Sequence, residues 1–395
     1  MNNKKTINDI IIDFIVNNYN KIFIITVILL SLLIRLYFVP WRSSDYNNDL
    51  KNWFTYFQEY GLFGFKNIYD VANYPALYMI IMALTSLLPP FSIESYPDLS
   101  IIFYIKLPSI INDFFTAFIV SKIIKEYTNK DYLSYIAFTC VLFSPLVLFN
   151  GALIGQIDGL YSSFAVFSLY FFYKKEYIKA FLLFGISIAI KTTAIFIFPL
   201  IILLYIKERF HFKYFFLILV PHVIASLIAA IFGANFIKAL TILGGQRYQN
   251  LSNRAPSLPA LIFRGASFEQ FYKWMFMTFF IILAIVLCAI FLYMFIKQKN
   301  KLNFDTFILW ALTISFSIPF ILPSMHERFF YISEILALIY AFMKPKYAYI
   351  TILLYFSTFS RYLYSSYLQE FTAAVLMLIV FILLMRTLIK ENKFE

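Results

Sequence analysis

A few polar residues whose side chains could do chemistry stand at or near the ends of long apolar stretches of this chain. They are four carboxylates, an amide, a lysine and one short charged run: Asp45, Asp49, Asp113, Asp158, Gln156, Lys191 and Met325-His326-Glu327-Arg328. Ionisable side chains inside a membrane are costly and usually mark a functional site. A carboxylate can accept a proton, and a guanidinium can bind a phosphate group at two points. The residue types therefore predict general base chemistry beside an anion-binding group.

The composition places these residues in a membrane protein. Of the 395 residues, 62% are hydrophobic and only 14% are charged, whereas a soluble domain has about 25% charged residues. Spanning helices need about 20 apolar residues. Six stretches approach or exceed that length, at residues 22–39, 133–154, 214–234, 274–296, 306–323 and 371–385. We expect an all-α polytopic bundle of roughly 11 to 13 transmembrane helices, formed as a single domain by residues 1–395.

Basic residues gather in the short connections between the apolar stretches. They are Lys4/Lys5, Lys122/Lys125/Lys130, Lys174/Lys175/Lys179, Lys207/Arg209/Lys213, Lys297/Lys299/Lys301, Lys344/Lys346 and Arg386/Lys390/Lys393. By the positive-inside rule these connections are cytoplasmic. The net charge of +12 then belongs mostly to the inner membrane surface, so it implies a membrane and no nucleic acid as partner.

The remaining connections hold nearly all the unusual polar residues. They are the outer loop 40–73, residues 150–159, the segment around Lys191, the outer loop 234–273 and residues 324–328. We therefore expect a multi-pass protein of the cell membrane whose active site faces away from the cytoplasm.

Two parts of the chain do not fit ordinary spans. Residues 180–190 and 192–206 are short and meet at Lys191, and short helices are tolerated where they line a cavity enclosed by protein. Residues 100–125 are too short for two spans. Either this stretch breaks near Pro108 or Asn112-Asp113, or residues 74–88 are re-entrant.

The first outer loop places Asp45 and Asp49 four residues apart. Either carboxylate could be a general base, and the pair could bind a divalent cation if further ligands joined it. The alternative is that one of them caps the helix that follows, because aspartate is favoured at helix N-termini. Phe54, Phe57, Tyr60 and Leu62 then follow Trp53 at roughly helical spacing. They predict an interfacial helix whose aromatic face lies at the bilayer surface.

Residues 150–159 interrupt the apolar sequence with an amide and a carboxylate flanked by glycines. Glycines let the backbone approach a ligand closely, so Gln156 and Asp158 are candidates for binding. The alternative is a polar connection between helices. For Arg328 the alternative is snorkelling to the headgroups, and for Lys191 it is the positive flanking of a helix.

Several segments together form a wider pattern: Asp45, Asn73-Tyr74-Pro75, Lys106-Leu107-Pro108-Ser109 with Asp113, Gly155-Gln156-Ile157-Asp158, Lys191 and Met325-His326-Glu327-Arg328-Phe329-Phe330. This pattern resembles the GT-C integral-membrane glycosyltransferases, and most closely the bacterial branch related to the second mannosyltransferase of GPI-anchor assembly. The likeness runs from about residue 22 to residue 390. Ile154 departs from it, because a tryptophan commonly precedes Gly-Gln, and Asp49 is a second match for the acid of the outer loop.

The resemblance implies transfer of mannose or another hexose from a polyprenyl phosphate, such as undecaprenyl or dolichyl phosphate, to the hydroxyl of a lipid- or glycan-linked acceptor, with inversion. The implied general base is Asp45, with Asp49 as second choice. The implied phosphate-binding residues are Arg328, His326, Lys191 and Arg254, and those orienting the sugar or the loops are Gln156, Asp158, Asp113 and Glu327. No cofactor is implied with certainty, and a divalent cation on the paired carboxylates stays an open alternative.

Two other classes of protein share some of these features. A transporter or flippase of lipid-linked sugars also holds charges in a membrane cavity, but it predicts matched broken helices in two repeats, and the sequence has no such repeat. A polymerase or ligase of surface glycans would share the donor and the sidedness.

The polar residues 244–259 are predicted to close over the acceptor in a transferase.

Overall fold

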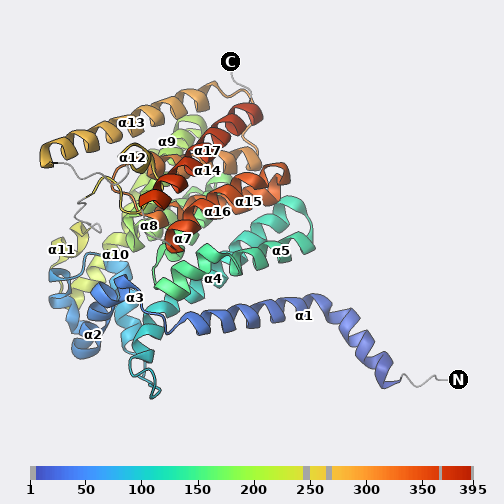
Figure 1. The fold of residues 1–395 in the computed structure, drawn as a ribbon, viewed down its shortest axis with the longest axis vertical. Coiled ribbons are helices and arrows are strands. Elements are labelled where there is room, and N and C mark those ends of the chain that lie inside the picture. Colours follow the sequence, from blue (N-terminus) through green and yellow to red (C-terminus); the bar gives the residue numbers. More distant parts are fainter. Residues whose placement is uncertain (1–5, 243–249, 264–268, 364–366, 393–395) are drawn as a thin grey trace.

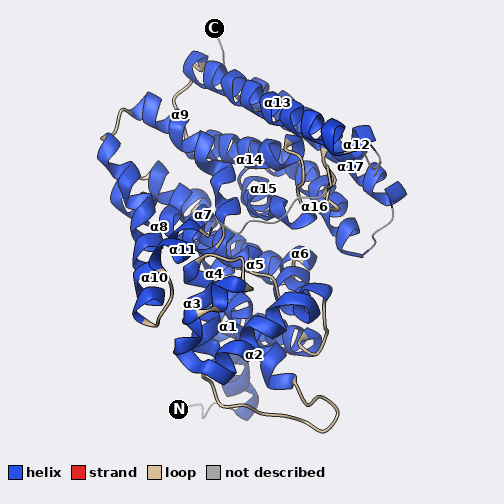
Figure 2. Cartoon of the chain, turned by 90° about the vertical axis from the view of Figure 1, so that its left-hand side faces the viewer, coloured by secondary structure: helices blue, strands red, loops and turns tan. Residues whose placement is uncertain are grey.

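The computed structural model describes residues 6–242, 250–263, 269–363 and 367–392. Within these ranges the chain is helical, with isolated β-bridges and no strand (Figures 1 and 2). The helices are α1 (Ile7–Phe38), α2 (Lys51–Tyr60), α3 (Ala76–Ser86), α4 (Leu99–Thr128), α5 (Asp131–Leu142), α6 (Pro145–Leu148), α7 (Asp158–Tyr173), α8 (Tyr177–Ile190), α9 (Phe198–Glu208), α10 (Leu219–Ile231), α11 (Phe236–Thr241), α12 (Leu258–Phe263), α13 (Gln270–Lys297), α14 (Phe304–Ile321), α15 (Tyr331–Met343), α16 (Ala348–Leu363) and α17 (Tyr367–Glu391). The prediction of an all-α fold is confirmed.

Six of the described helical segments are long and apolar enough to cross a membrane. They are α1, α4, Phe212–Ile231, α13, α14 and Gln369–Glu391. A seventh span results if the pair Asp131–Leu142 and Pro145–Ile154, bent by 43°, is counted as one. The structure therefore supports a multi-pass membrane protein. It does not reach the predicted 11 to 13 spans, because elements such as α3 and α8 are shorter than a full crossing.

The long helices differ in how much protein surrounds them. In α14 every residue from Thr306 to Ile321 is buried, so this helix is the centre of the bundle. By contrast only 17% of the apolar window of α1 and 28% of that of α13 are buried, and both lie at the edge of the bundle (Figure 1). Their exposed apolar faces fit contact with lipid.

The open question at residues 100–125 is answered by α4, which is one continuous helix with Pro108 inside it. Of the two alternatives, the break at Pro108 or Asn112-Asp113 is therefore wrong. The short element is α3, which at 11 residues and about 1.5 Å per residue covers only part of the bilayer. The expected pair of short helices around Lys191 is confirmed, because α8 ends at Ile190 and Lys191 is extended.

Most of the aromatic face of α2 is covered by protein, which corrects the prediction for the outer loop 40–73. Phe54 and Phe57 are fully buried and Trp53 is 3% exposed, whereas Tyr60, at the end of α2, is 51% exposed. Trp53 packs against Tyr74, with the ring centroids 5.6 Å apart. The helical spacing identified an apolar face correctly, but this face packs onto the protein, including α3 and α4.

Candidate active site

A polar cavity of about 580 Å³ lies where several connections meet. Its walls are formed by Ser43, Ser44, Asp45, Ile154, Asn250, Ser252, Asn253, Arg254, His326, Glu327, Arg328 and Glu370. We call it the polar cavity. Five residues predicted for the site, among them Asp45 and Arg328, thus line one cavity although 283 positions separate these two.

Asp45 lies in the wall of the polar cavity with 30% of its side chain exposed. Its Oδ2 accepts hydrogen bonds from Gln156 Nε2 and from Arg328 Nη1, the latter at 2.9 Å. Burial opposes the ionisation of Asp45, but Arg328, Gln156 and Lys191 outweigh it and lower the pKa of the carboxyl. Within the described chain its side chain makes no capping bond to the turn that follows. The capping alternative therefore does not explain Asp45.

Arg328 stands between two carboxylates. Its Nη1 is 2.9 Å from Asp45 Oδ2, and its Nε is 3.8 Å from Asp158 Oδ2. Asp158 in turn accepts from Asn150 Nδ2 at 3.1 Å and pairs with Lys191 Nζ at 2.5 Å. Opposite charges therefore alternate along a row from Asp45 through Arg328 and Asp158 to Lys191. We call these four residues the charged row.

Lys191 occupies the inner end of the charged row and does not line the polar cavity. Only 10% of its side chain is exposed, and its ammonium lies 5.5 to 5.8 Å from the ring centroids of Tyr74, Tyr161 and Phe329. A buried cation among aromatic faces is stabilised by their quadrupoles. The structure thus places Lys191 behind Arg328, where it supports Asp158.

Gln156 is oriented by the backbone around it. The main-chain N–H of Gln156 donates to Asn150 O at 2.9 Å, and its main-chain carbonyl accepts from Ser109 Oγ at 2.8 Å. The preceding Gly155 has φ +80°, and a Cβ at this position would lie 3.2 Å from Lys106 Cγ. The glycine therefore makes room for a lysine of the protein, whereas the sequence suggested close approach to a ligand.

Lys106 joins the two loops that supply Asp45 and Gln156. Its buried ammonium donates to the carbonyls of Val39, Trp41 and Leu153 at 2.8 to 2.9 Å, and to that of Phe38 at 3.3 Å. Hydrogen bonds from a charged donor are the strong ones. Lys106 therefore holds the start of the first outer loop against residues 149–154.

His326 and Glu327 both line the polar cavity. Burial, and then the charges of Arg328 and Lys191, lower the pKa of His326 to about 3, although Asp45 opposes this. The free protein therefore has a neutral His326 at neutral pH, which can give a phosphate a hydrogen bond but no charge. Burial raises the pKa of Glu327, and the charge of Arg328 opposes that effect.

Asp113 and Asp49 are two more predicted residues that do not line the polar cavity, and neither belongs to the charged row. Asp113 is 1% exposed and forms an ion pair with Arg35, whose Nε is 2.9 Å from Asp113 Oδ2. This buried pair connects α1 with α4, and the predicted role of Asp113 in orienting the sugar or the loops stays a prediction. Asp49 is exposed and does not line the cavity. Burial and the charge of Asp45 raise the pKa of Asp49.

Residues 250–254 form one wall of the polar cavity and pair with the chain before Arg328. Asn253 N donates to Met325 O at 3.0 Å, and Ser324 N donates to Leu251 O at 2.7 Å. Arg254 and Ser324 both have left-handed backbone, at φ 68° and 62°. Residues 244–259 were predicted to close over the acceptor. Of these, residues 244–249 lie outside the described residues, and residues 250–254 are held by these hydrogen bonds.

The residues that anchor this wall are ones that the sequence reasoning missed. Arg361 of α16 donates from Nε to Arg254 O at 3.1 Å, and its Nη2 is 3.6 Å from Glu370 Oε2. Glu370 of α17 accepts a hydrogen bond from Ser252 Oγ. A usable signal existed, because an arginine within an apolar helix is costly unless it is paired.

The described residues contain no group of three or more His, Cys, Asp or Glu side chains that could hold a metal ion. Asp45 is already engaged by Arg328 and Gln156. The paired carboxylates of the first outer loop therefore do not fit a cation site as they stand, and no step below depends on one.

An aromatic groove adjoins the polar cavity. Its volume is about 640 Å³, and it is lined by Tyr37, Phe38, Pro40, Trp41, Tyr96, Phe149, Leu153, Tyr362 and Leu363. Leu153 in this groove is followed directly by Ile154 in the polar cavity, and Trp41 is two positions before Ser43. A molecule with a polar and an apolar part could therefore lie in both.

Comparison with known proteins agrees with a membrane transferase. The model of glycosyltransferase family 87 matches residues 73–319, which include Gln156, Asp158 and Lys191 but neither Asp45 nor Arg328. No curated protein matches the chain. Because the match spans more than half of the chain, this protein belongs to glycosyltransferase family 87 and is a glycosyltransferase.

Proposed function

We propose that the protein transfers a hexose from a polyprenyl phosphate to an acceptor hydroxyl on the side of the membrane away from the cytoplasm, with Asp45 as general base. The observation that supports this most is the polar cavity, which holds a carboxylate and a guanidinium and adjoins an aromatic groove. The resemblance to GT-C enzymes favours mannose as the sugar and a lipid- or glycan-linked acceptor. The lipid tail of the donor would occupy the aromatic groove.

The proposed reaction is a single displacement. The acceptor oxygen attacks the anomeric carbon and gives its proton to Asp45, while the bond from that carbon to the phosphate oxygen breaks and its electrons remain on the phosphate. Arg328, with Arg254 and a hydrogen bond from His326, stabilises the developing charge on that phosphate. Attack from the face opposite the leaving phosphate inverts the anomeric configuration.

The contact between Asp45 and Arg328 suggests how the donor prepares the base. In the free protein Arg328 Nη1 is 2.9 Å from Asp45 Oδ2, and it lowers the pKa of Asp45. A donor phosphate would compete with Asp45 for the guanidinium. Once Arg328 turns to the phosphate, Asp45 becomes a stronger proton acceptor, so the base is activated only when a donor is bound.

The direct test is consumption of the donor by the purified protein. With undecaprenyl-phosphate hexoses and candidate acceptors, we expect polyprenyl phosphate and glycosylated acceptor to appear in equal amounts, as measured by mass spectrometry. A transporter would move the lipid-linked sugar in proteoliposomes without releasing polyprenyl phosphate. That result, or no consumption of any hexose donor, would contradict the proposal.

The sidedness of the site is a second prediction. Three helices, α7, α15 and α17, begin near the polar cavity and end beside Lys174, Lys344 and Lys390. In a background without Cys140 and Cys288, we expect Asn250→Cys to react with a membrane-impermeant thiol reagent in intact cells, and Lys175→Cys to react only after permeabilisation. The reverse pattern would overturn the proposed orientation. Gln246, also predicted to be external, lies outside the described residues.

A further inference from the structure

A second pocket lies at the opposite end of α17 from the polar cavity. Glu370, near the start of α17, lines the polar cavity, whereas Arg386 and Lys390 line the second pocket. The helical rise puts Glu370 roughly 24 Å from Arg386 and roughly 30 Å from Lys390 along the axis of α17. That distance is close to the thickness of the hydrocarbon layer, about 30 Å. The second pocket therefore lies near the other membrane boundary.

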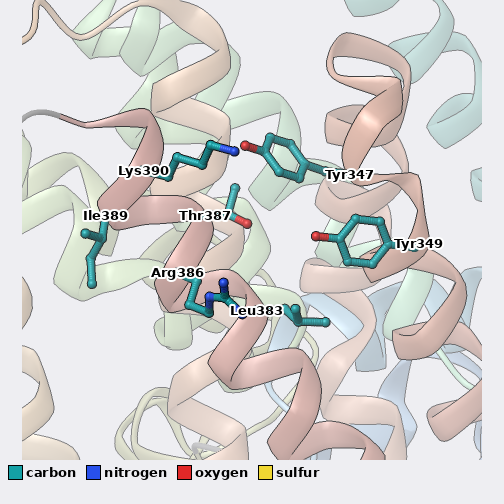
Figure 3. Close-up of a pocket in the computed structure, with 7 residues that line it drawn as sticks. All are labelled: Tyr347, Tyr349, Leu383, Arg386, Thr387, Ile389 and Lys390. Atoms are coloured by element: carbon teal, nitrogen blue, oxygen red, sulfur yellow. The ribbon is translucent and has the colours of Figure 1, made fainter.

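This pocket has a volume of about 380 Å³ and is lined by Tyr347, Tyr349, Leu383, Arg386, Thr387, Ile389 and Lys390. We call it the basic pocket. Figure 3 shows Arg386, Thr387 and Lys390 on one helix, with the hydroxyl groups of Tyr347 and Tyr349 turned toward them from the other wall. The two cations and the hydroxyl of Tyr349 suit the oxygens of a phosphate group, whereas the hydroxyl of Tyr347 donates to Glu391.

The two cations of the basic pocket, Arg386 and Lys390, are available to bind an anion, whereas the nearby lysines Lys344 and Lys346 are paired with carboxylates of the protein. Lys346 Nζ is 2.8 Å from Glu391 Oε1, which also accepts from the hydroxyl of Tyr347 at 2.6 Å. Lys344 pairs with Asp305 at 2.7 Å. In the described part of the chain no ion pair engages Arg386 or Lys390, and both side chains are exposed. An anion from outside the protein would therefore meet two uncompensated charges one helical turn apart.

An apolar surface continues from the basic pocket along α17. Ile389 in its wall is 55% exposed, and Ile382 and Ile379, further toward the middle of the helix, are 48% and 41% exposed. A ligand with a phosphate group and hydrocarbon chains could place its phosphate in the basic pocket and its chains along this apolar surface. A free phosphate ion would use only the pocket.

We propose that the basic pocket binds the phosphate group of an anionic phospholipid in the leaflet at this end of the bundle. The site is separate from the polar cavity and does not depend on the proposed transfer reaction. The competing explanation is that Arg386 and Lys390 are ordinary snorkelling residues, attracted to any negative surface. That explanation requires neither the tyrosines nor the pocket.

The test compares two double variants of the full chain with the same change in charge. Arg386→Gln with Lys390→Gln removes the cations of the basic pocket, whereas Arg209→Gln with Lys213→Gln removes two exposed cations outside it. Native mass spectrometry of the delipidated protein, titrated with phosphatidylglycerol, gives the dissociation constant. We expect the pocket variant to bind about tenfold more weakly, as the loss of charge-assisted hydrogen bonds implies, and the control variant to bind as the wild type does.

Three outcomes would overturn the proposal. Equal weakening in both double variants would indicate a diffuse charge effect, and unchanged binding in both would exclude the pocket. Displacement of the lipid by inorganic phosphate at a similar concentration would indicate a site for a soluble anion. Tyr349→Phe is a milder second variant, and we expect it to weaken phosphatidylglycerol binding without changing the thermal stability of the protein.

Discussion

Asp45→Asn is expected to lower turnover by about 10²-fold to 10⁴-fold, the range for loss of a general base. An asparagine can keep the hydrogen bonds that Gln156 Nε2 and Arg328 Nη1 donate to Asp45 Oδ2, so the cavity should keep its shape. Donor binding should survive, because other residues hold the phosphate. The measurement is kcat and the donor KM with a polyprenyl-phosphate hexose. In the wild type, kcat/KM reports the pKa of Asp45 in the free protein, and kcat reports it with the donor bound. Because the bound phosphate draws Arg328 away from Asp45, that pKa should be higher with the donor bound. The acidic limb of the kcat profile should therefore lie at higher pH than that of the kcat/KM profile.

Asp49→Asn is the matched control for this prediction. Asp49 is exposed and lies outside the polar cavity, so its variant should stay near the activity of the wild type. A large loss there, with Asp45→Asn still active, would transfer the role of base to Asp49. Loss in both variants would favour a shared site of two carboxylates, and a chelator would then test for a metal. Normal turnover in both would reject this loop as the source of the base.

Arg328→Lys is expected to reduce kcat/KM for the donor by about 10²-fold to 10³-fold, the effect of removing one preorganised donor to a developing anion. The side chain of Arg328 is 11% exposed, and its guanidinium lies near Asp45 through Nη1 and near Asp158 through Nε. A lysine has no planar fork and cannot make both contacts at once. Steady-state kinetics at varied donor concentration, together with thermal stability in detergent, would measure the effect.

Arg42→Lys is a fitting control, because Arg42 also pairs with a carboxylate, Asp98, but lies outside the polar cavity. It should leave donor use unchanged. A folded Arg328→Lys protein with the donor dependence of the wild type would show that Arg328 does not bind the phosphate, and the assignment would then pass to Arg254.

The charged row illustrates what the sequence could predict. Each of its residues interrupts or ends an apolar stretch, and charge in such places is costly enough to imply a partner. The sequence therefore identified Asp45, Asp158, Lys191 and Arg328 as one group. It could not tell which of them face the cavity, because that depends on side chains from distant helices. Only the structure shows that Lys191 supports Asp158 from behind.

Other features could not be predicted for the same physical reason. The spacing of Phe54 and Phe57 reveals an apolar face but not whether lipid or protein covers it, and here protein covers it. The ion pair of Asp113 could not be predicted either, because its partner, Arg35, lies 78 positions away in the first helix. The position of Arg361 in an apolar helix implies a partner, but the sequence does not show that Arg361 and Glu370 anchor residues 252–254.

The burial of α14 has a consequence for how the protein is made. Of the six long apolar segments, α4 and α14 are the least hydrophobic, yet 56% and 89% of their apolar windows are covered by protein in the finished fold. Helices enter the membrane while the chain is being made, and weakly hydrophobic helices insert poorly by themselves. Insertion of α4 and α14 must therefore rely on neighbours that are already in the bilayer. Substitutions in α14 should consequently lower the amount of protein in the membrane before they change what each molecule does.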